Sequence, residues 1–153
     1  MIKFIDNFLN DEQISGLLSL WDDKSYYEVN DEIYRFKGID LLPIIDKLNI
    51  PEILKSRKSY NSLRLQLVNE SINQVEYYHA HTEPFSFAVF LNEEFSGGGL
   101  VFLDKEPIKP KKGTIVYFTG EERHRVESTI GNRFTLIGFL REDIFNKQSK
   151  GFI

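Results

Sequence analysis

Apolar residues recur along the chain with two different periods, and the change of period divides the sequence into two parts. In the first part, four apolar residues recur at helical spacing, namely Ile14, Leu17, Leu18 and Trp21. Asn10 precedes them as an N-cap residue, and Gln13 stands three residues later, where a capping box places its second member. The pattern predicts an amphipathic helix over about residues 11–22.

A second helical pattern follows in residues 41–48. Leu42, Ile45 and Leu48 fall on one face of this segment, and the pattern ends before Pro51, which cannot continue a helix. We therefore expect two helices in the first third of the chain.

From about residue 60, the sequence pattern changes to short runs rich in aromatic and β-branched residues, separated by Gly, Pro and Asn. The predicted strands are 62–68, 75–81, 85–91, 100–104, 113–118, 124–129 and 133–140. Short strands at this spacing are typical of an antiparallel sandwich or barrel. Residues 85–91 and 133–140 are apolar on both faces, so one sheet needs a cover on its outer side.

These elements predict a mainly β fold, a double-stranded β-helix (jelly roll) with the N-terminal helices packed on one sheet. The 153 residues are the size of one domain. We expect residues 1–153 to form that domain, with a helical lead-in over about 1–58 and the jelly-roll core over about 59–142.

Composition narrows the classes of partner and of metal site. The formal net charge is −4, which gives no general attraction to nucleic acid, and no apolar stretch is long enough to cross a membrane. A lysine cluster at 105, 109, 111 and 112 is interpreted as a solvated turn between strands.

With no cysteine, any metal must be held by His, carboxylate or carbonyl groups. We expect a cytoplasmic protein that binds neither nucleic acid nor membrane; its oligomeric state is open.

His81, Glu83 and His124 form a candidate metal site. His81 and Glu83 are two residues apart at the end of a predicted strand, so alternation sends both side chains to the same face. His124 opens a later strand that a jelly roll can bring opposite to them. Two imidazoles and one carboxylate on one side of an ion are the facial triad of non-haem Fe(II) oxygenases, which leaves the opposite positions open.

Arg133 and Thr135 form a candidate anion site on the next predicted strand. Arg133 follows His124 by nine residues, and Thr135 shares its face. A buried guanidinium on the inward face of a strand is unfavourable unless it meets an anion. A dicarboxylate bound in the barrel would supply that anion, with the Thr135 hydroxyl as a further donor.

Read together, these motifs resemble the catalytic core of prolyl-4-hydroxylase-like 2-oxoglutarate/Fe(II) oxygenases. Such cores carry His-x-Asp, a Leu-Asn turn, a Gly-Gly strand ending in Phe, a Pro-x-x-Gly hairpin, and a distal His followed nine or ten residues later by Arg or Lys. The matching residues here are His81 and Glu83, Leu91 and Asn92, Gly98, Gly99 and Phe102, Pro110 and Gly113, and His124 and Arg133.

The resemblance implies an enzyme that uses Fe(II), 2-oxoglutarate as cosubstrate, and O₂ to hydroxylate a C–H bond. It implies that His81, Glu83 and His124 bind the metal, that Arg133 and Thr135 bind the cosubstrate, and that Tyr78 contacts it or packs in the wall. The implied substrate is a prolyl residue of a peptide or protein, although related cores act on free amino acids and other small molecules.

Two departures from the family pattern stand out. Glu83 replaces the usual aspartate, and Phe90 replaces a tyrosine that in several relatives helps the arginine to hold the far carboxylate. We expect Glu83 to bind with adjusted geometry and Thr135 to compensate for Phe90.

His79 raises an alternative, because His79-x-His81 also resembles the ligand pair of a cupin, another jelly-roll metal protein. The cupin pattern expects its Glu several residues after the second His and leaves Arg133 unexplained. We interpret His79 as a residue that supports the ligands or lies on the rim, and keep a cupin-type metal protein as the rival hypothesis.

Overall fold

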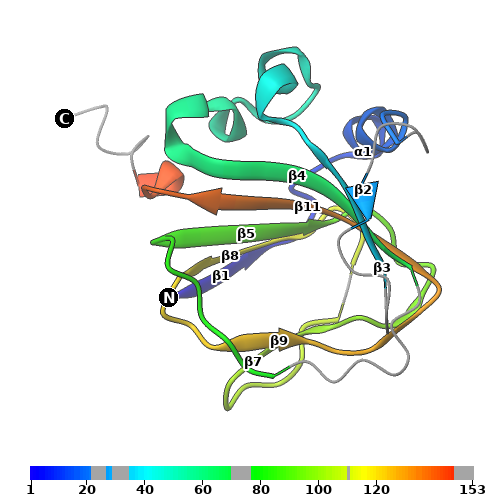
Figure 1. The fold of residues 1–153 in the computed structure, drawn as a ribbon, viewed down its shortest axis with the longest axis vertical. Helices are drawn as coiled ribbons and strands as arrows, with labels where there is room; N and C mark the ends of the chain where they lie inside the picture. The colour runs from blue at the N-terminus through cyan, green and yellow to red at the C-terminus, as the bar shows by residue number, and fades with distance from the viewer. Residues whose placement is uncertain (22–26, 29–34, 70–76, 110, 147–153) are drawn as a thin grey trace.

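The computed structural model describes residues 1–21, 27–28, 35–69, 77–109 and 111–146. Its centre is a seven-stranded antiparallel sheet with the order β1-β8-β5-β11-β4-β3-β2. The strands are β1 (Ile2–Ile5), β2 (Tyr27–Glu28), β3 (Arg35–Asp40), β4 (Tyr60–Asn69), β5 (Phe85–Phe90), β8 (Ile115–Thr119) and β11 (Asn132–Leu140). The long pair β4 and β11 lies in the middle of this major sheet, as Figure 1 shows.

A smaller layer faces one side of the major sheet. It consists of β7 (Leu100–Phe102) paired with β9 (His124–Val126), and β6 (Ser96–Gly97) paired with β10 (Thr129–Ile130). In Figure 1, β7 and β9 lie below the major sheet and the helical segments lie above it. This arrangement confirms the predicted jelly roll with helices on one sheet.

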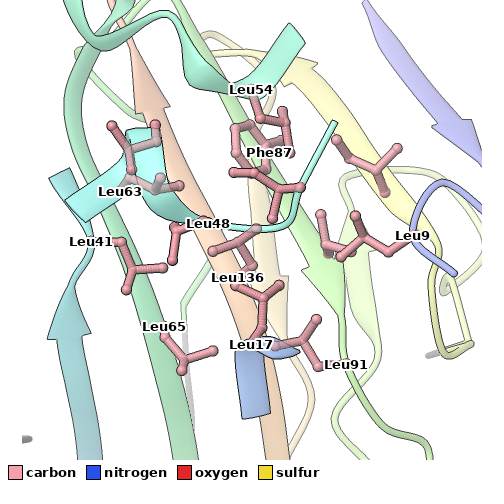
Figure 2. Close-up of a cluster of buried hydrophobic side chains, with 14 of the residues drawn as sticks. Leu9, Leu17, Leu41, Leu48, Leu54, Leu63, Leu65, Phe87, Leu91 and Leu136 are labelled. Atoms are coloured by element: carbon pink, nitrogen blue, oxygen red, sulfur yellow. The ribbon is translucent and has the colours of Figure 1, made fainter. Parts of the chain in front are cut away.

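The outer face of the major sheet is covered by α1 (Asp11–Leu18) and the 3₁₀ segments η1 (Leu42–Lys47), η2 (Glu52–Lys55) and η3 (Arg57–Ser59). Leu17, Ile45 and Leu54 from the helical segments are fully or nearly fully buried against sheet residues such as Leu63 and Leu136. Figure 2 shows these leucines pointing toward one another across the interface. Burying a Leu side chain contributes about 1.5–3 kcal/mol, so this face anchors the lead-in to the sheet.

Strict alternation along β11 separates the two sides of the sheet. Leu136 and Leu140 point into the helix-covered core, whereas Arg133 and Thr135 line a cavity on the other side, together with Ile137 and Phe139. A second cluster of buried residues fills the rest of the space between the layers, namely Phe90, Leu100, Phe102, Val116 and Phe118. The major sheet is therefore buried on both faces, as the apolar runs predicted.

The lead-in differs from the expected one in three ways. Helix α1 ends at Leu18 rather than near residue 22, and the second predicted helix is the short 3₁₀ segment η1. The first 58 residues also supply strands β1, β2 and β3, which extend the major sheet at its two ends. These strands were missed because hydrogen bonding to a neighbour, rather than an alternating buried face, holds a strand such as β1, whose residues are mostly exposed.

The lysine cluster behaves as the solvated turn that was predicted. Lys111 lies 3.7 Å from Asp6 and Lys112 lies 3.1 Å from Asp11, in ion pairs that are open to solvent. Exposed pairs of this kind contribute about 0–1 kcal/mol, so they tie the turn only loosely to the lead-in.

Candidate metal and cosubstrate site

Three histidines converge at one end of the space between the two layers. His79 pairs with His124 across an antiparallel bridge, and each backbone N–H donates to the other's carbonyl oxygen at 2.9 Å. His81 follows two residues after His79, so its side chain turns to the same side. The ligand nitrogens that these three residues offer all lie within 4.8 Å of one another.

The imidazoles are held by partners outside the cluster. His79 Nδ1 lies 3.1 Å from the Tyr77 carbonyl oxygen, and His124 Nδ1 lies 3.0 Å from the Glu122 carbonyl oxygen. A carbonyl oxygen can only accept, so both Nδ1 atoms donate, and in the neutral rings the lone pair is on Nε2. His81 Nδ1 lies 2.9 Å from Ser86 Oγ. Outer hydrogen bonds of this kind fix the tautomer and the orientation of histidines that bind metals.

The surroundings favour neutral rings, which is the form that binds a metal. Burial lowers the pKa of His124 to about 4, against the opposing effect of its hydrogen bond to Glu122. Burial also lowers the pKa of His81, His79 lowers it further, and the Glu83 carboxylate acts in the opposite direction. These two imidazoles are therefore ready at neutral pH to donate a lone pair to a metal.

Glu83 is not part of this convergence. Residues 82–84 form a bend rather than a strand, in which the Gly120 N–H donates to the Pro84 carbonyl at 2.8 Å. The alternation that predicted a shared face for His81 and Glu83 ends at His81. The carboxylate accepts a long hydrogen bond from Thr82 Oγ1 at 3.4 Å. In the part of the chain that the structure describes, the group of side chains close enough together to hold a metal ion is His79, His81 and His124, and Glu83 is not in it.

Arg133 and Thr135 lie at the other end of the same space, on the inward face of β11. Both are buried, at 7% and 2% exposure. Arg133 Nη1 donates to the Gly98 carbonyl at 3.4 Å, and a Cβ at Gly98 would lie 3.1 Å from Arg133 Cδ, so the glycine leaves room for the arginine. Thr135 is the cross-strand partner of Phe90, which places it beside the residue whose missing hydroxyl it was expected to replace.

The Thr135 hydroxyl has no hydrogen-bond partner among the described residues. Leaving a buried hydroxyl unsatisfied destabilises the protein by about 1–3 kcal/mol unless a ligand or water satisfies it. A donor buried beside a guanidinium fits a carboxylate, so the residues at this end fit the far carboxylate of 2-oxoglutarate.

A single cavity of about 180 Å³ joins the two ends. Its lining contains His79, His81 and His124 as well as Arg133 and Thr135. Phe118 and Phe139 form apolar wall beside the metal end, where their ring centroids lie 6.0 Å and 5.0 Å from that of His81. The cavity therefore has three imidazoles at one end, the Arg133 guanidinium at the other, and apolar walls between them.

Of the sequence-predicted site residues, the structure brings together His81, His124, Arg133 and Thr135. Tyr78 is not in the lining; its ring lies under the Arg125 guanidinium at 5.4 Å and is 37% exposed. His79, expected to support the ligands or lie on the rim, is exposed, as a rim residue would be, and its ring is also a member of the cluster. The alternating His79-x-His81 pattern was the signal for it, but only the strand register could show which pair faces His124.

Comparison with known families agrees with this geometry. Residues 69–141 match the model of the 2OG-Fe(II) oxygenase superfamily, a family that uses Fe(II), 2-oxoglutarate and O₂. No curated protein matches the chain. Among the described residues, no helix is long and apolar enough to cross a membrane.

Solved structures of the same fold include several oxygenases. A Pseudomonas putida prolyl-4-hydroxylase is 17% identical with a TM-score of 0.64, covering 93% of this chain and 92% of its own. A 2OG-Fe(II) oxygenase family oxidoreductase from Burkholderia pseudomallei is 13% identical with a TM-score of 0.67, covering 92% and 86%. A Trichoplax adhaerens prolyl hydroxylase, solved with a hypoxia inducible factor peptide fragment, is 14% identical with a TM-score of 0.63, covering 91% and 82%. At these identities, the likeness establishes the fold.

Proposed function

We propose that this protein hydroxylates a prolyl residue of a peptide or protein, on the premise that residues 69–141, which match the model of the 2OG-Fe(II) oxygenase superfamily, are an oxygenase core. The observation that carries the proposal is the single cavity with histidine ligands at one end and Arg133 with Thr135 at the other. A cosubstrate that must chelate a metal and also present a distant carboxylate needs both ends at once.

The protein's own residues position and shield the reactants. Arg133 binds the far carboxylate of 2-oxoglutarate by charge-assisted hydrogen bonds, and Thr135 donates its hydroxyl to the same group. Phe118 and Phe139 exclude water around the metal end. Bound Fe(II) and 2-oxoglutarate would supply the oxidising chemistry with O₂ as the oxidant: one oxygen atom would enter the substrate C–H bond as a hydroxyl group, the other would enter succinate, and CO₂ would be released from 2-oxoglutarate.

The prolyl substrate is supported by the fold likeness to prolyl hydroxylases and by the apolar wall beside the metal end, which suits a saturated ring. A peptide or protein is the proposed partner. A free amino acid or another small molecule is the alternative within the same reaction class.

The cupin-type alternative gains one specific observation, the presence of His79 in the cluster. In that case, the protein would use its histidines without 2-oxoglutarate. Arg133 and Thr135 argue for the oxygenase, because they form an anion-binding end that such a protein does not need.

The test measures cosubstrate binding and turnover in the parent protein and in Arg133→Met. Anaerobic protein with Fe(II) and 2-oxoglutarate should show the weak visible absorption of the metal chelate, and in air it should form succinate, faster with a prolyl peptide than without. Arg133→Met should weaken 2-oxoglutarate binding by about thirtyfold or more, since losing one partner of a buried charge pair costs about 2–5 kcal/mol.

Arg57→Met is the matched control, because it removes a half-exposed guanidinium on the helix-covered side of the sheet. Its cosubstrate affinity should equal that of the parent. Unchanged binding in Arg133→Met would refute the anion-binding assignment. Fe(II) binding without any conversion of 2-oxoglutarate would favour the cupin-type alternative.

A further inference from the structure

We propose that the metal of this site is held by three imidazoles, those of His79, His81 and His124, and that Glu83 is not a ligand. The inference rests on the proposed function for the identity of the metal as Fe(II). The proposed ligand set differs from the two histidines and one carboxylate that the family pattern implies. It shifts the ligand motif by two residues, from His81-x-Glu83 to His79-x-His81.

Strand register carries the reassignment. His79 and His124 are direct partners in an antiparallel bridge with both hydrogen bonds at 2.9 Å, so their side chains emerge next to each other on one face. Their ring centroids lie 4.4 Å apart. His81 reaches the same face from two residues on, with ring centroids 4.6 Å from His124 and 5.4 Å from His79.

All three histidine rings make a hydrogen bond on the side that faces away from the cluster. Each has its Nδ1 atom bound to a partner away from the cluster, two of them to carbonyl oxygens that can only accept. In the tautomer that these bonds select, the lone pair of a neutral ring lies on Nε2 in His79 and in His124, and His81 also makes its hydrogen bond through Nδ1.

After His81, the backbone leaves the strand geometry that predicted Glu83 as a ligand. The His81 N–H donates to the Gly120 carbonyl at 2.9 Å, and three residues later the Pro84 carbonyl accepts from the Gly120 N–H. The chain therefore turns around Gly120, where any Cβ would collide with the Glu83 carbonyl oxygen. Because residues 82–84 follow this bend, the Glu83 side chain loses the strand alternation that would aim it at the metal.

The ligand set changes the charge of the centre. Three neutral imidazoles leave the full +2 charge of the ion in place, whereas a carboxylate ligand would reduce it to +1. Imidazole is a suitable ligand for Fe, Zn, Cu and Ni. The described residues that line this cavity include no acidic side chain, so within the cavity the anionic cosubstrate would offset the metal charge, which couples the metal end to the anion that Arg133 would hold.

The experiment counts the histidine nitrogens bound to the metal, without using activity. The parent protein, His79→Ala and Glu83→Gln are each loaded with Cu(II) as a probe, and pulsed EPR counts the imidazoles on the ion. Anaerobic equilibrium dialysis then gives the Fe(II) affinity of each protein. We expect three imidazoles in the parent and in Glu83→Gln, and two in His79→Ala. Fe(II) affinity should fall by more than about tenfold in His79→Ala and stay within about twofold of the parent in Glu83→Gln.

Two imidazoles in the parent protein would overturn the proposal, and so would a large loss of Fe(II) affinity in Glu83→Gln with none in His79→Ala. The count on the parent is decisive even if His79→Ala fails to fold. The proposed function is judged separately, by succinate formation. Three imidazoles without succinate would leave this inference standing and refute the function, whereas succinate with two imidazoles would do the reverse.

Discussion

The pKa of the buried His124 ring is lowered, and this has a consequence for the stability of the protein without metal. Its pKa falls from 6.5 to about 4 because the ring is buried. Between these values, the unfolded chain binds a proton that the folded protein does not, so lowering the pH favours unfolding. In the presence of a chelator, the free energy of unfolding should fall by on the order of 2 kcal/mol on this account as the pH drops from 7 to 4.5.

Urea unfolding of the parent and of His124→Phe at both pH values measures this effect. Phe keeps a ring in the same volume but cannot be protonated. Other groups titrate in both proteins, so the informative quantity is the difference between the two pH dependences. An equal loss of stability in the parent and in His124→Phe would contradict the prediction.

Thr135 should show opposite effects on stability and on binding. Its buried hydroxyl has no partner among the described residues, so replacing it with a methyl group in Thr135→Val should leave the metal-free protein equally stable or more stable by about 1 kcal/mol. The same change removes a donor to a carboxylate, which should weaken 2-oxoglutarate binding by about tenfold or more.

Thr135→Ser is the matched control, because it keeps the hydroxyl and removes only the methyl group. It should retain most of the cosubstrate affinity. Calorimetric titration of 2-oxoglutarate into the metal-loaded proteins, with urea unfolding of the metal-free ones, checks both parts. Weaker binding in Thr135→Ser than in Thr135→Val would show that packing, rather than the hydroxyl, is what matters there.

At the scale of elements, β11 depends on a glycine for its packing. Gly138 lies opposite Phe87 on β5, and a Cβ at Gly138 would enter the Phe87 ring. Because the ring is buried and cannot move away freely, Gly138→Ala should destabilise the protein by about 1–3 kcal/mol.

Gly16→Ala is the same substitution with the opposite expected sign. Gly16 is exposed in helix α1, and no atom lies within 4 Å of an added Cβ. Alanine there should stabilise the protein by about 0.5–1 kcal/mol through its higher helix propensity. Urea unfolding midpoints of the two variants should shift in opposite directions, and a stabilised Gly138→Ala would show that Phe87 has room to move.

The elements that could be predicted from the sequence are those with a local signature. Helix α1 begins where the capping box placed it, with the Gln13 N–H donating to Asn10 Oδ1 at 2.8 Å and the Asn10 N–H donating to Gln13 Oε1 at 3.0 Å. Strands β5 and β11 follow their apolar runs closely, since both faces of the sheet are buried. Strand β1 left no comparable pattern, because its pairing with β8 depends on partners more than a hundred residues away.

In the candidate site too, only the residues with a local signature in the sequence could be predicted. Arg133 could be assigned because a cation on the inward face of a strand requires an anion, and His124 because it precedes that arginine at the spacing of the family pattern. Proposing His79 instead of Glu83 as a ligand required knowing that His79 lies opposite His124 and that the chain bends at residues 82–84. Register and bends of this kind arise from tertiary packing, so a period-two pattern alone could not decide between the two.

At the scale of the whole molecule, the cavity lies between the two layers, which also meet through an apolar cluster. The histidines come from β9 and the segment beside it, whereas Arg133 and Thr135 come from the major sheet. A metal held by the histidines would join β9 to the segment that carries His79 and His81, and 2-oxoglutarate bound to that metal would reach β11. Each ligand should therefore stabilise the fold, and the two contributions should depend on different residues.

Ligand-dependent melting tests this division of roles. A ligand present at a hundred times its Kd stabilises a protein by about 2.7 kcal/mol, which for a chain of this length is a rise in Tm of about 5–10 °C. Under nitrogen, Fe(II) should raise the Tm of the parent, and 2-oxoglutarate should raise it further only when Fe(II) is present. Arg133→Met should keep the first rise and lose the second, whereas His79→Ala should lose both. A parent protein whose Tm responds to 2-oxoglutarate equally with and without Fe(II) would show that the cosubstrate does not span the two ends of the cavity.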